Sequence, residues 1–187
     1  MSSEKAPIDI SQAYTFCPLC GAKRTVFEPM KPFRCDACGH TSFFGPVTAV
    51  GGVILNEVGQ VLLIERARDP GAGKLGMPGG FVDPYETAEE SLHREVWEEV
   101  GLKIEGLQFL MTHPNRYTYH GVTCPVLDLF YSARVCHSQV VSAAASEVSK
   151  WMWTELTPGV LDRMAFESNR LALEHYLKHW SQTKSKN

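Results

Sequence analysis

Three glutamates lie close together in residues 94–99, REVWEE. On a helix of 3.6 residues per turn, Glu95, Glu98 and Glu99 fall within an arc of about 100°. Like charges at these spacings destabilise a helix by about 0.2–0.5 kcal/mol per pair, and a hard divalent cation removes that repulsion. Mg²⁺ and Mn²⁺ prefer carboxylate oxygens as ligands. The spacing by itself fits either a cation site or a solvated acidic helix face.

Two glycines ahead of the glutamates favour the cation site. The run Pro78-Gly79-Gly80 precedes the acidic segment. Because glycine has no side chain, it lets the backbone approach a phosphate or a metal closely. We therefore interpret residues 78–102 as one functional stretch.

A helix between Thr87 and Gly101 must position these carboxylates. Thr87 can cap the first turn, and Glu90 three residues later can complete a capping box. Gly101 can adopt the left-handed conformation that ends a helix. Apolar residues fall on the flank beside the glutamates: Ala88, Leu92, Val96 and Val100. The pattern predicts a helix that holds the three carboxylates at the edge of a core.

A second set of chemically active residues consists of two Cys-x-x-Cys pairs. Cys17 and Cys20 are separated from Cys35 and Cys38 by fourteen residues, and a glycine follows each pair. Four thiolates can bind one tetrahedral metal, and no position is left open for catalysis. Iron would also fit four thiolates, but zinc is the commoner occupant of such a site. The spacing resembles a zinc ribbon, which we expect over residues 14–42 with a structural Zn²⁺.

The stretch around the helix resembles the signature of the Nudix hydrolases. That pattern is Gly, five residues, Glu, seven residues, then Arg-Glu-apolar-x-Glu-Glu-x-Gly-apolar. Its fixed positions are met by Gly80, Glu86, Arg94, Glu95, Val96, Glu98, Glu99, Gly101 and Leu102. The resemblance implies a metal-dependent pyrophosphohydrolase, which cleaves the pyrophosphate bond of a nucleoside diphosphate linked to another moiety with bound Mg²⁺ or Mn²⁺.

The same resemblance implies metal-binding roles for individual residues. Glu98 and Glu99 are expected to bind the cations, with Glu95 as a ligand or as the general base. The carbonyl group of Gly80 is a further candidate ligand. In several members of the family another carboxylate completes the metal site or acts as the base, and Glu147 is the candidate here.

Other residues are expected to support the site. By the resemblance, Arg94 holds one glutamate in a bidentate ion pair, and Glu86 binds water or metal at the rim. Arg66, Arg68 and Lys74 lie in a loop before the signature. These three cations could bind substrate phosphates or could equally be solvated loop charges.

Two tyrosines further along the chain are candidates for contact with a base. Tyr117 and Tyr119 belong to residues 112–125, which we expect to form an aromatic and polar loop. Stacking on a base contributes about 1–3 kcal/mol where it occurs. Half-buried packing is the alternative interpretation of both side chains.

The resemblance implies an α/β fold, a Nudix α/β/α sandwich around a mixed sheet, over residues 47–180. Strands are expected at 47–55, 60–65, 103–111, 126–135 and 148–153, with a final helix from about 159 to 180. The alternation of strands with two long helices is consistent with that architecture.

Composition limits the partners and the compartment. The formal net charge is −3 and the pI is near 6.2, so there is no general basic field and nucleic acid is not an expected partner. The sequence shows neither a signal peptide nor a membrane span, and paired cysteines of this kind favour a reducing, cytoplasmic location. A homodimer remains an open alternative to a monomer.

The substrate class follows only from the resemblance. A zinc ribbon joined to a Nudix domain resembles the NADH pyrophosphatases, which carry a Ser-Gln-Pro-Trp-Pro-Phe run after the signature. Residues 113–125 read HPNRYTYHGVTCP instead. ADP-ribose, NAD(H) or a related dinucleotide is therefore the expected substrate. The alternative is a silent Nudix-like nucleotide sensor whose ribbon contacts a partner or nucleic acid.

Overall fold

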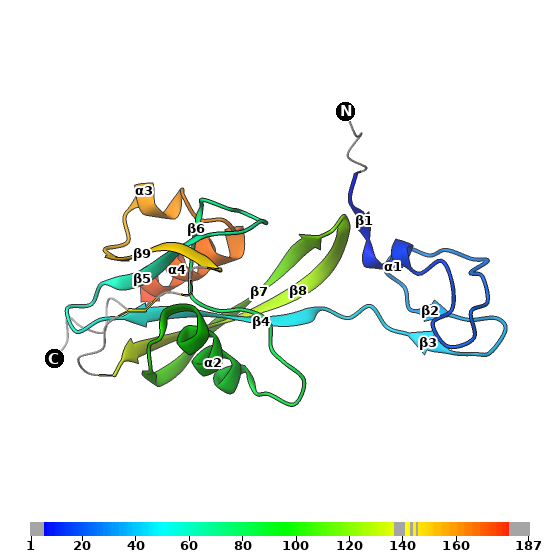
Figure 1. The fold of residues 1–187 in the computed structure, drawn as a ribbon, viewed down its shortest axis with the longest axis horizontal. Coiled ribbons are helices and arrows are strands. Elements are labelled where there is room, and N and C mark those ends of the chain that lie inside the picture. The colour runs from blue at the N-terminus through cyan, green and yellow to red at the C-terminus, as the bar shows by residue number, and fades with distance from the viewer. Residues whose placement is uncertain (1–5, 137–140, 143, 145, 180–187) are drawn as a thin grey trace. The chain divides into compact units, whose positions relative to one another are not determined.

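The computed structural model describes residues 6–136, 141–142, 144 and 146–179, which fall into two compact units (Figure 1). The smaller unit comprises Met1–Val47 and Asn115–Val126, and the larger comprises Thr48–Pro114 and Leu127–Asn187. Across the described ranges, no helix is both long and apolar enough to cross a membrane.

The larger unit is built on a β-sheet. Its strands are β4 (Val47–Leu55), β5 (Val61–Arg66), β6 (Leu75–Gly76), β7 (Ile104–Tyr119), β8 (Val122–Val135) and β9 (Val148–Thr154). The order is β8-β4-β5-β6, with β7 paired to β8 and β9 paired to β5. Strand β5 runs antiparallel to β4, β6 and β9. In the smaller unit, β1 (Ile8–Asp9) runs parallel to β8, so the pairing is mixed.

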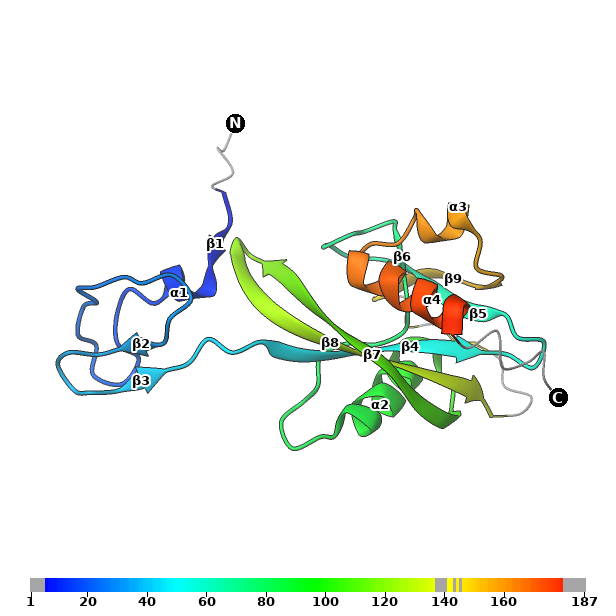
Figure 2. The same cartoon turned by 180° about the vertical axis from the view of Figure 1, so that it is seen from behind.

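Helices cover both faces of this sheet, as Figures 1 and 2 show. Helix α2 (Ala88–Val100) packs on one face, where Leu92 and Val96 join Ile54 and Leu62 in one core. Helix α4 (Glu167–His179) packs on the other, where Leu173 contributes to a second core. Neighbouring strand residues alternate between the two cores, as strand geometry requires. The predicted α/β/α sandwich with a mixed sheet is confirmed.

The prediction of a loop over residues 112–125 is wrong. Strands β7 and β8 run through this segment and are joined by a turn at His120 and Gly121, which both have positive φ. The hydroxyls of Thr118 and Thr123 pair across the hairpin at 2.8 Å. Cross-strand pairing of this kind stabilises two strands whose own sequences, with one proline in each, predict a loop.

The prediction of one helix from residue 159 to residue 180 is also wrong. The chain forms a short α3 (Pro158–Leu161) and then α4, while Trp180 lies outside the described residues. Between the helices, Leu75 of β6 donates to the Arg163 carbonyl at 3.0 Å and accepts from the Ala165 N–H at 2.7 Å. Pairing with the sheet replaces the helical hydrogen bonds here, a tertiary effect that overrides the local pattern.

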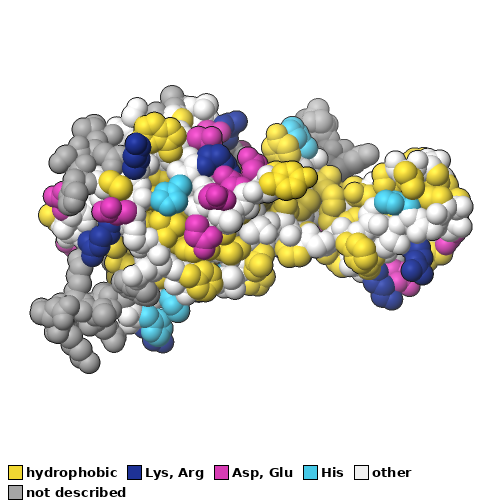
Figure 3. Space-filling model, turned by 90° about the horizontal axis from the view of Figure 1, so that it is seen from below, with side chains coloured by type: hydrophobic (Ala, Val, Ile, Leu, Met, Phe, Trp, Pro, Cys, Tyr) yellow, Lys and Arg dark blue, Asp and Glu magenta, His cyan; other side chains and the backbone are white. Residues whose placement is uncertain are grey.

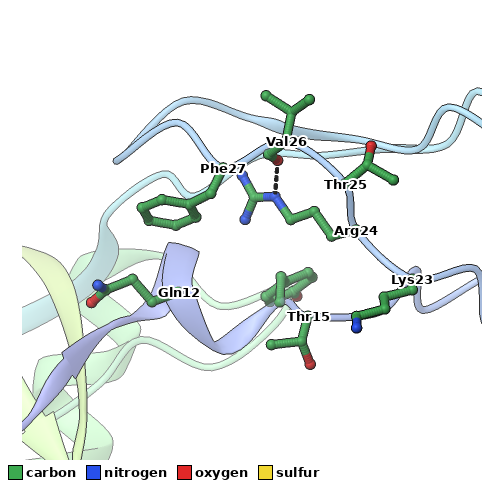
Figure 4. Close-up of a pocket in the computed structure, with 8 residues that line it drawn as sticks. Gln12, Thr15, Lys23, Arg24, Thr25, Val26 and Phe27 are labelled. Carbon is green, nitrogen blue, oxygen red and sulfur yellow. Dashed lines mark hydrogen bonds between the residues drawn. The ribbon is translucent and has the colours of Figure 1, made fainter.

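The smaller unit contains the cysteines. It comprises β1, α1 (Ile10–Ala13), β2 (Phe33–Arg34), β3 (Thr41–Ser42) and the ends of β7 and β8 that meet at their turn. Its core is formed by Cys17, Phe33 and Cys35. A pocket of about 330 Å³ lies within this unit (Figure 4). In it, Arg24 donates from Nε to the Val26 carbonyl at 2.7 Å, and its guanidinium lies 4.8 Å from the centre of the Phe27 ring.

Candidate active site and cysteine centre

Helix α2 carries the acidic residues and has the ends that its sequence predicts. The Thr87 hydroxyl accepts the Glu90 N–H at 3.2 Å, and the Thr87 N–H donates to Glu90 Oε2 at 2.9 Å. Gly101 has φ 67° and donates to the Trp97 carbonyl at 2.9 Å. The capping box and the left-handed cap are therefore confirmed.

Arg94 lies at the centre of the acidic cluster. Its Nε and Nη2 atoms donate to the two carboxylate oxygens of Glu86, both at 2.9 Å. Its Nη1 atom donates to Glu95 Oε1 at 2.8 Å and to Glu98 Oε2 at 3.1 Å. One guanidinium thus bridges three carboxylates, and the bidentate partner is Glu86.

The ion pairs with Arg94 shift the pKa values of these groups. Hydrogen bonding to Arg94 lowers the pKa of Glu86 to about 2, since it stabilises the charged carboxylate. The same bond is the main reason that the pKa of Arg94 rises above its ordinary value. Both groups are therefore charged at neutral pH.

Glu99 is the most deeply placed carboxylate of the cluster. It is 6% exposed and accepts the Gly79 N–H at 2.9 Å on Oε2. Burial raises its pKa to about 8, and the nearby charges of Glu95 and Glu147 act in the same direction. Burial likewise raises the pKa of Glu95. No basic side chain in the described residues lies within ion-pair distance of Glu99.

The glycines before the helix fit closely against this cluster. Residues 78–82 pair with β4, as the Val50 N–H donates to the Gly80 carbonyl at 2.8 Å and the Gly52 N–H to the Pro78 carbonyl at 2.9 Å. A Cβ atom on Gly80 would lie 2.5 Å from Glu95 Oε1. A side chain at position 80 would therefore displace that carboxylate.

The three cations predicted to contact phosphate have different surroundings. Arg66 donates from Nε to the Pro70 carbonyl at 2.8 Å and lies 5.1 Å from the Phe166 ring centre, and its charge opposes the rise in the pKa of Glu99. Arg68 pairs instead with Glu147 at 2.6 Å. Lys74 is exposed.

The remaining candidate residues are divided between the two units. Glu147 is 46% exposed, and its charge raises the pKa values of both Glu95 and Glu99. Tyr117 and Tyr119 belong to the smaller unit, where the Tyr119 ring packs edge-on against His120. Within the larger unit, Glu147 therefore lies close enough to Glu95 and Glu99 for its charge to affect both.

Several groups around Arg94 have no counterpart in the sequence prediction. Its Nη2 atom donates to the Phe81 carbonyl at 3.1 Å and to Ser91 Oγ at 3.3 Å, and it lies 3.8 Å from Asp83 Oδ2. Ser91 lies one helical turn before Arg94, so helical spacing could have indicated it. No sequence signal identifies a backbone carbonyl as a partner.

The four cysteines form a compact group in the smaller unit. Cys17 Sγ lies 3.7 Å from Cys38 Sγ, and Cys20 Sγ lies 3.6 Å from Cys35 Sγ. These separations exceed a disulfide bond length of about 2.05 Å. In the described part of the chain, this is the one group of three or more ligand side chains close enough to share an ion.

The acidic cluster has a different arrangement from the cysteines. Figure 3 shows acidic and basic side chains gathered on the face of the larger unit that carries α2. Arg94 holds Glu95 and Glu98, and the oxygens of the three helical glutamates do not all lie within reach of one ion. The site therefore contains Arg94 as an internal cation, together with the buried carboxylate of Glu99, which has no ion-pair partner among the described residues.

Comparison with known proteins identifies the class. A family model of the NUDIX domain matches residues 45–173, which is more than half of the chain. The chain therefore belongs to the NUDIX family.

Two curated relatives and one solved structure show the range of similarity. The chain is 33% identical over 97 residues to the NAD-capped RNA hydrolase NudC of Chromobacterium violaceum, covering 52% of this chain and 36% of that protein. It is 40% identical over 76 residues to the ADP-ribose pyrophosphatase of Methanocaldococcus jannaschii, covering 40% and 44%. The matches thus span less than half the length of either relative. The NUDIX domain of Shewanella oneidensis NrtR, solved in complex with ADP ribose, is similar with a TM-score of 0.59 and 25% identity, covering 73% of this chain and 89% of that one.

Proposed function

We propose that this chain hydrolyses the pyrophosphate bond of a nucleoside diphosphate linked to another moiety and releases a nucleoside monophosphate. ADP-ribose and NAD(H) are the proposed substrates. This choice is supported by the similarity of the chain to an NAD-capped RNA hydrolase, to an ADP-ribose pyrophosphatase and to a NUDIX domain solved with ADP ribose. Family membership supports the reaction class.

The observation that carries the proposal is the environment of Glu99. A carboxylate that is 6% exposed and has no cationic side chain at ion-pair distance in the described residues is costly in its charged form. Half-buried Glu95 lies nearby and adds to that cost. The donor set consists of hard oxygen atoms, which suits Mg²⁺ or Mn²⁺.

The residues proposed to hold such a cation are Glu98 and Glu99, with Glu95 as a ligand or as the general base and with the Gly80 carbonyl and Glu147 as further ligands. Because the oxygens of the three helical glutamates do not all lie within reach of one ion, the exposed Glu98 side chain would have to turn from Arg94 toward the cation. The Gly80 carbonyl accepts one backbone hydrogen bond and retains a second lone pair. When bound, the cation would polarise a phosphoryl oxygen and offset the charge that develops on it.

The side chains of the chain itself supply positioning and proton transfer. Arg94 fixes Glu86 and orients Glu95 through short hydrogen bonds. Glu95, half-buried and with a raised pKa, is the proposed general base for the attacking water. Arg66, held by Pro70 and Phe166, is proposed to bind a substrate phosphate, whereas Arg68 and Lys74 are weaker candidates.

The cysteine centre is proposed to hold a structural Zn²⁺. Its four thiols are close enough to share one ion and leave no position open for substrate. In this proposal the metal of the smaller unit stabilises the fold and does not touch the scissile phosphate.

A hydrolysis screen tests the proposal. Purified protein with Mg²⁺ should be assayed on NADH, ADP-ribose, FAD, diadenosine polyphosphates and oxidised nucleotides. We expect AMP as the first nucleotide product from NADH or ADP-ribose, with ¹⁸O from labelled water in one phosphate product. Free adenosine or inorganic phosphate as the first product would contradict the proposed reaction. Tight binding of ADP-ribose without turnover would favour the sensor alternative.

A further inference from the structure

The turn that carries Glu86 contains a residue whose type conflicts with its backbone. Asp83, Pro84, Tyr85 and Glu86 form a tight turn in which the Glu86 N–H donates to the Asp83 carbonyl at 3.2 Å. Tyr85 occupies the third position with φ 70°. A positive φ at this position, after proline, is typical of a type II turn, where glycine or asparagine is preferred. A bulky residue in that conformation costs about 1–2 kcal/mol.

The Tyr85 side chain is not buried, so it does not stabilise the fold and offset this strain. Its relative exposure is 108%, so the ring is as open to solvent as in an extended chain. Packing of the ring against the rest of the protein therefore does not explain a tyrosine at this position. Residues that break a local rule without a structural gain are concentrated at functional sites.

The turn that carries Tyr85 is hydrogen-bonded to the acidic cluster. The Asp83 N–H donates to Glu86 Oε2 at 3.1 Å, and Glu86 forms the bidentate ion pair with Arg94. Arg94 also bonds Glu95 and Glu98, which belong to the proposed pyrophosphate site. The turn is thus tied through Arg94 to the glutamates, and it carries a fully exposed aromatic ring.

A second aromatic residue lies on the same short segment. Phe81 is 39% exposed, and its carbonyl accepts a hydrogen bond from Arg94. Dinucleotides carry flat aromatic rings joined through ribose to the pyrophosphate. The proposed cation site would bind the pyrophosphate. The exposed aromatic ring on the neighbouring segment would contact the base of the same nucleotide.

We propose that Tyr85 is a specificity-determining residue that stacks on the adenine ring of the dinucleotide substrate. This inference rests on the proposed function. Stacking on an aromatic side chain contributes about 1–3 kcal/mol per base, which corresponds to an affinity change of about 5-fold to 150-fold. The gain in substrate binding offsets the strain that the turn carries.

Two substitutions distinguish the effect of the aromatic ring from the effect of the strained turn. Tyr85→Asn keeps a residue that tolerates the left-handed conformation and removes the ring. Tyr85→Phe keeps the ring and the backbone strain. We expect Tyr85→Asn to raise the melting temperature and to raise KM for ADP-ribose at least 5-fold, whereas Tyr85→Phe should match the wild-type KM and melting temperature.

The binding of ADP-ribose should also be measured by calorimetry with Ca²⁺ in place of Mg²⁺, so that Kd is separated from turnover. A weaker Kd for Tyr85→Asn but not for Tyr85→Phe supports stacking. Equal Kd and KM values in all three proteins would overturn this inference while leaving the proposed hydrolysis intact. A fall in kcat alone would assign Tyr85 to the placement of Glu86 and would also overturn it. If the wild-type protein neither binds nor hydrolyses ADP-ribose or NADH, both proposals fail.

Discussion

At the scale of single residues, neighbouring glutamates of α2 have opposite environments. Glu99 is buried and bonded to a backbone N–H, whereas the Glu98 side chain is 57% exposed and bonded to Arg94. A buried carboxylate is held in one geometry, and an exposed one can reorient toward a cation. The two residues should therefore respond differently to neutralisation.

Neutralising Glu98 should affect catalysis far more than stability. We expect Glu98→Gln to lower kcat by about 10²–10⁴-fold, the range for loss of a positioned catalytic group. Its melting temperature should stay near that of the wild type, because the side chain is more than half exposed. Glu105→Gln, the same change at an exposed position of β7, is the matched control. Near wild-type turnover of Glu98→Gln with Mg²⁺ would refute the metal assignment.

Neutralising Glu99 should change the pH dependence of stability. Burial raises the pKa of this carboxyl from its ordinary value of 4.5 to about 8. Between these values the folded state holds a proton that the unfolded state has released, so stability falls as pH rises. The limiting slope for one proton is about 1.4 kcal/mol per pH unit.

Urea unfolding at pH 5, 6, 7 and 8, without Mg²⁺ or Mn²⁺, measures this effect. We expect the free energy of unfolding of the wild type to decrease across the series more steeply than that of Glu99→Gln. Added Mg²⁺ should reduce the difference, because a bound cation stabilises the charged carboxylate. Identical slopes for the two proteins would show that Glu99 is not protonated in the folded state.

At the scale of elements, the loop before α2 and the helix itself depend on each other. The loop is held by β4 through the Gly80 and Pro78 carbonyls, and the helix is held by its caps and by the core beneath it. Glu95 and Gly80 meet where these two elements face each other. Their spacing leaves no room for a methyl group.

Gly80→Ala tests that spacing. The new Cβ would lie 2.5 Å from Glu95 Oε1, so the flexible carboxylate must move. We expect a fall in kcat of up to about 10²-fold, the scale of a displacement near 1 Å, with little loss of stability. Gly159→Ala is the control, because a Cβ at Gly159 meets nothing within 4 Å. Unchanged kcat in Gly80→Ala would argue against a role for Glu95.

At the scale of the whole molecule, the chain separates into two units with unequal cores. The larger unit has two extensive hydrophobic clusters, whereas the buried cluster of the smaller unit consists of Cys17, Phe33 and Cys35. So small a core cannot stabilise a fold by burial alone. A metal bound by the cysteines would supply the missing stability.

Cys35→Ser should therefore unfold or loosen the smaller unit selectively. We expect less than one equivalent of zinc per chain by metal analysis and a lower melting temperature. The folded fraction, in excess Mg²⁺, should keep most of its turnover on ADP-ribose. Cys124→Ser, at a cysteine outside the cluster, should keep the full zinc content. A folded, zinc-free variant without turnover would show that the ribbon builds part of the active site.

Local signals in the sequence were sufficient for the features formed by neighbouring residues. Thr87, Glu90 and Gly101 define both ends of α2 because capping involves residues within one turn. Each cysteine pair, with its following glycine, forms a tight turn whose spacing can be read directly, since Gly21 and Gly39 both have positive φ. These features depend on bonds between residues a few positions apart.

Tertiary structure alone decided the features that depend on distant partners. The break between α3 and α4 arises because Leu75 bonds to residues 163 and 165. The length of the β7–β8 hairpin depends on pairing between strands rather than on either strand's composition. The pairing of Arg94 with Glu86 and the burial of Glu99 beside exposed Glu98 also depend on contacts between α2 and residues 79–86. Hydrogen-bond partners and burial are set by contacts across the fold, and a linear pattern does not encode those distances.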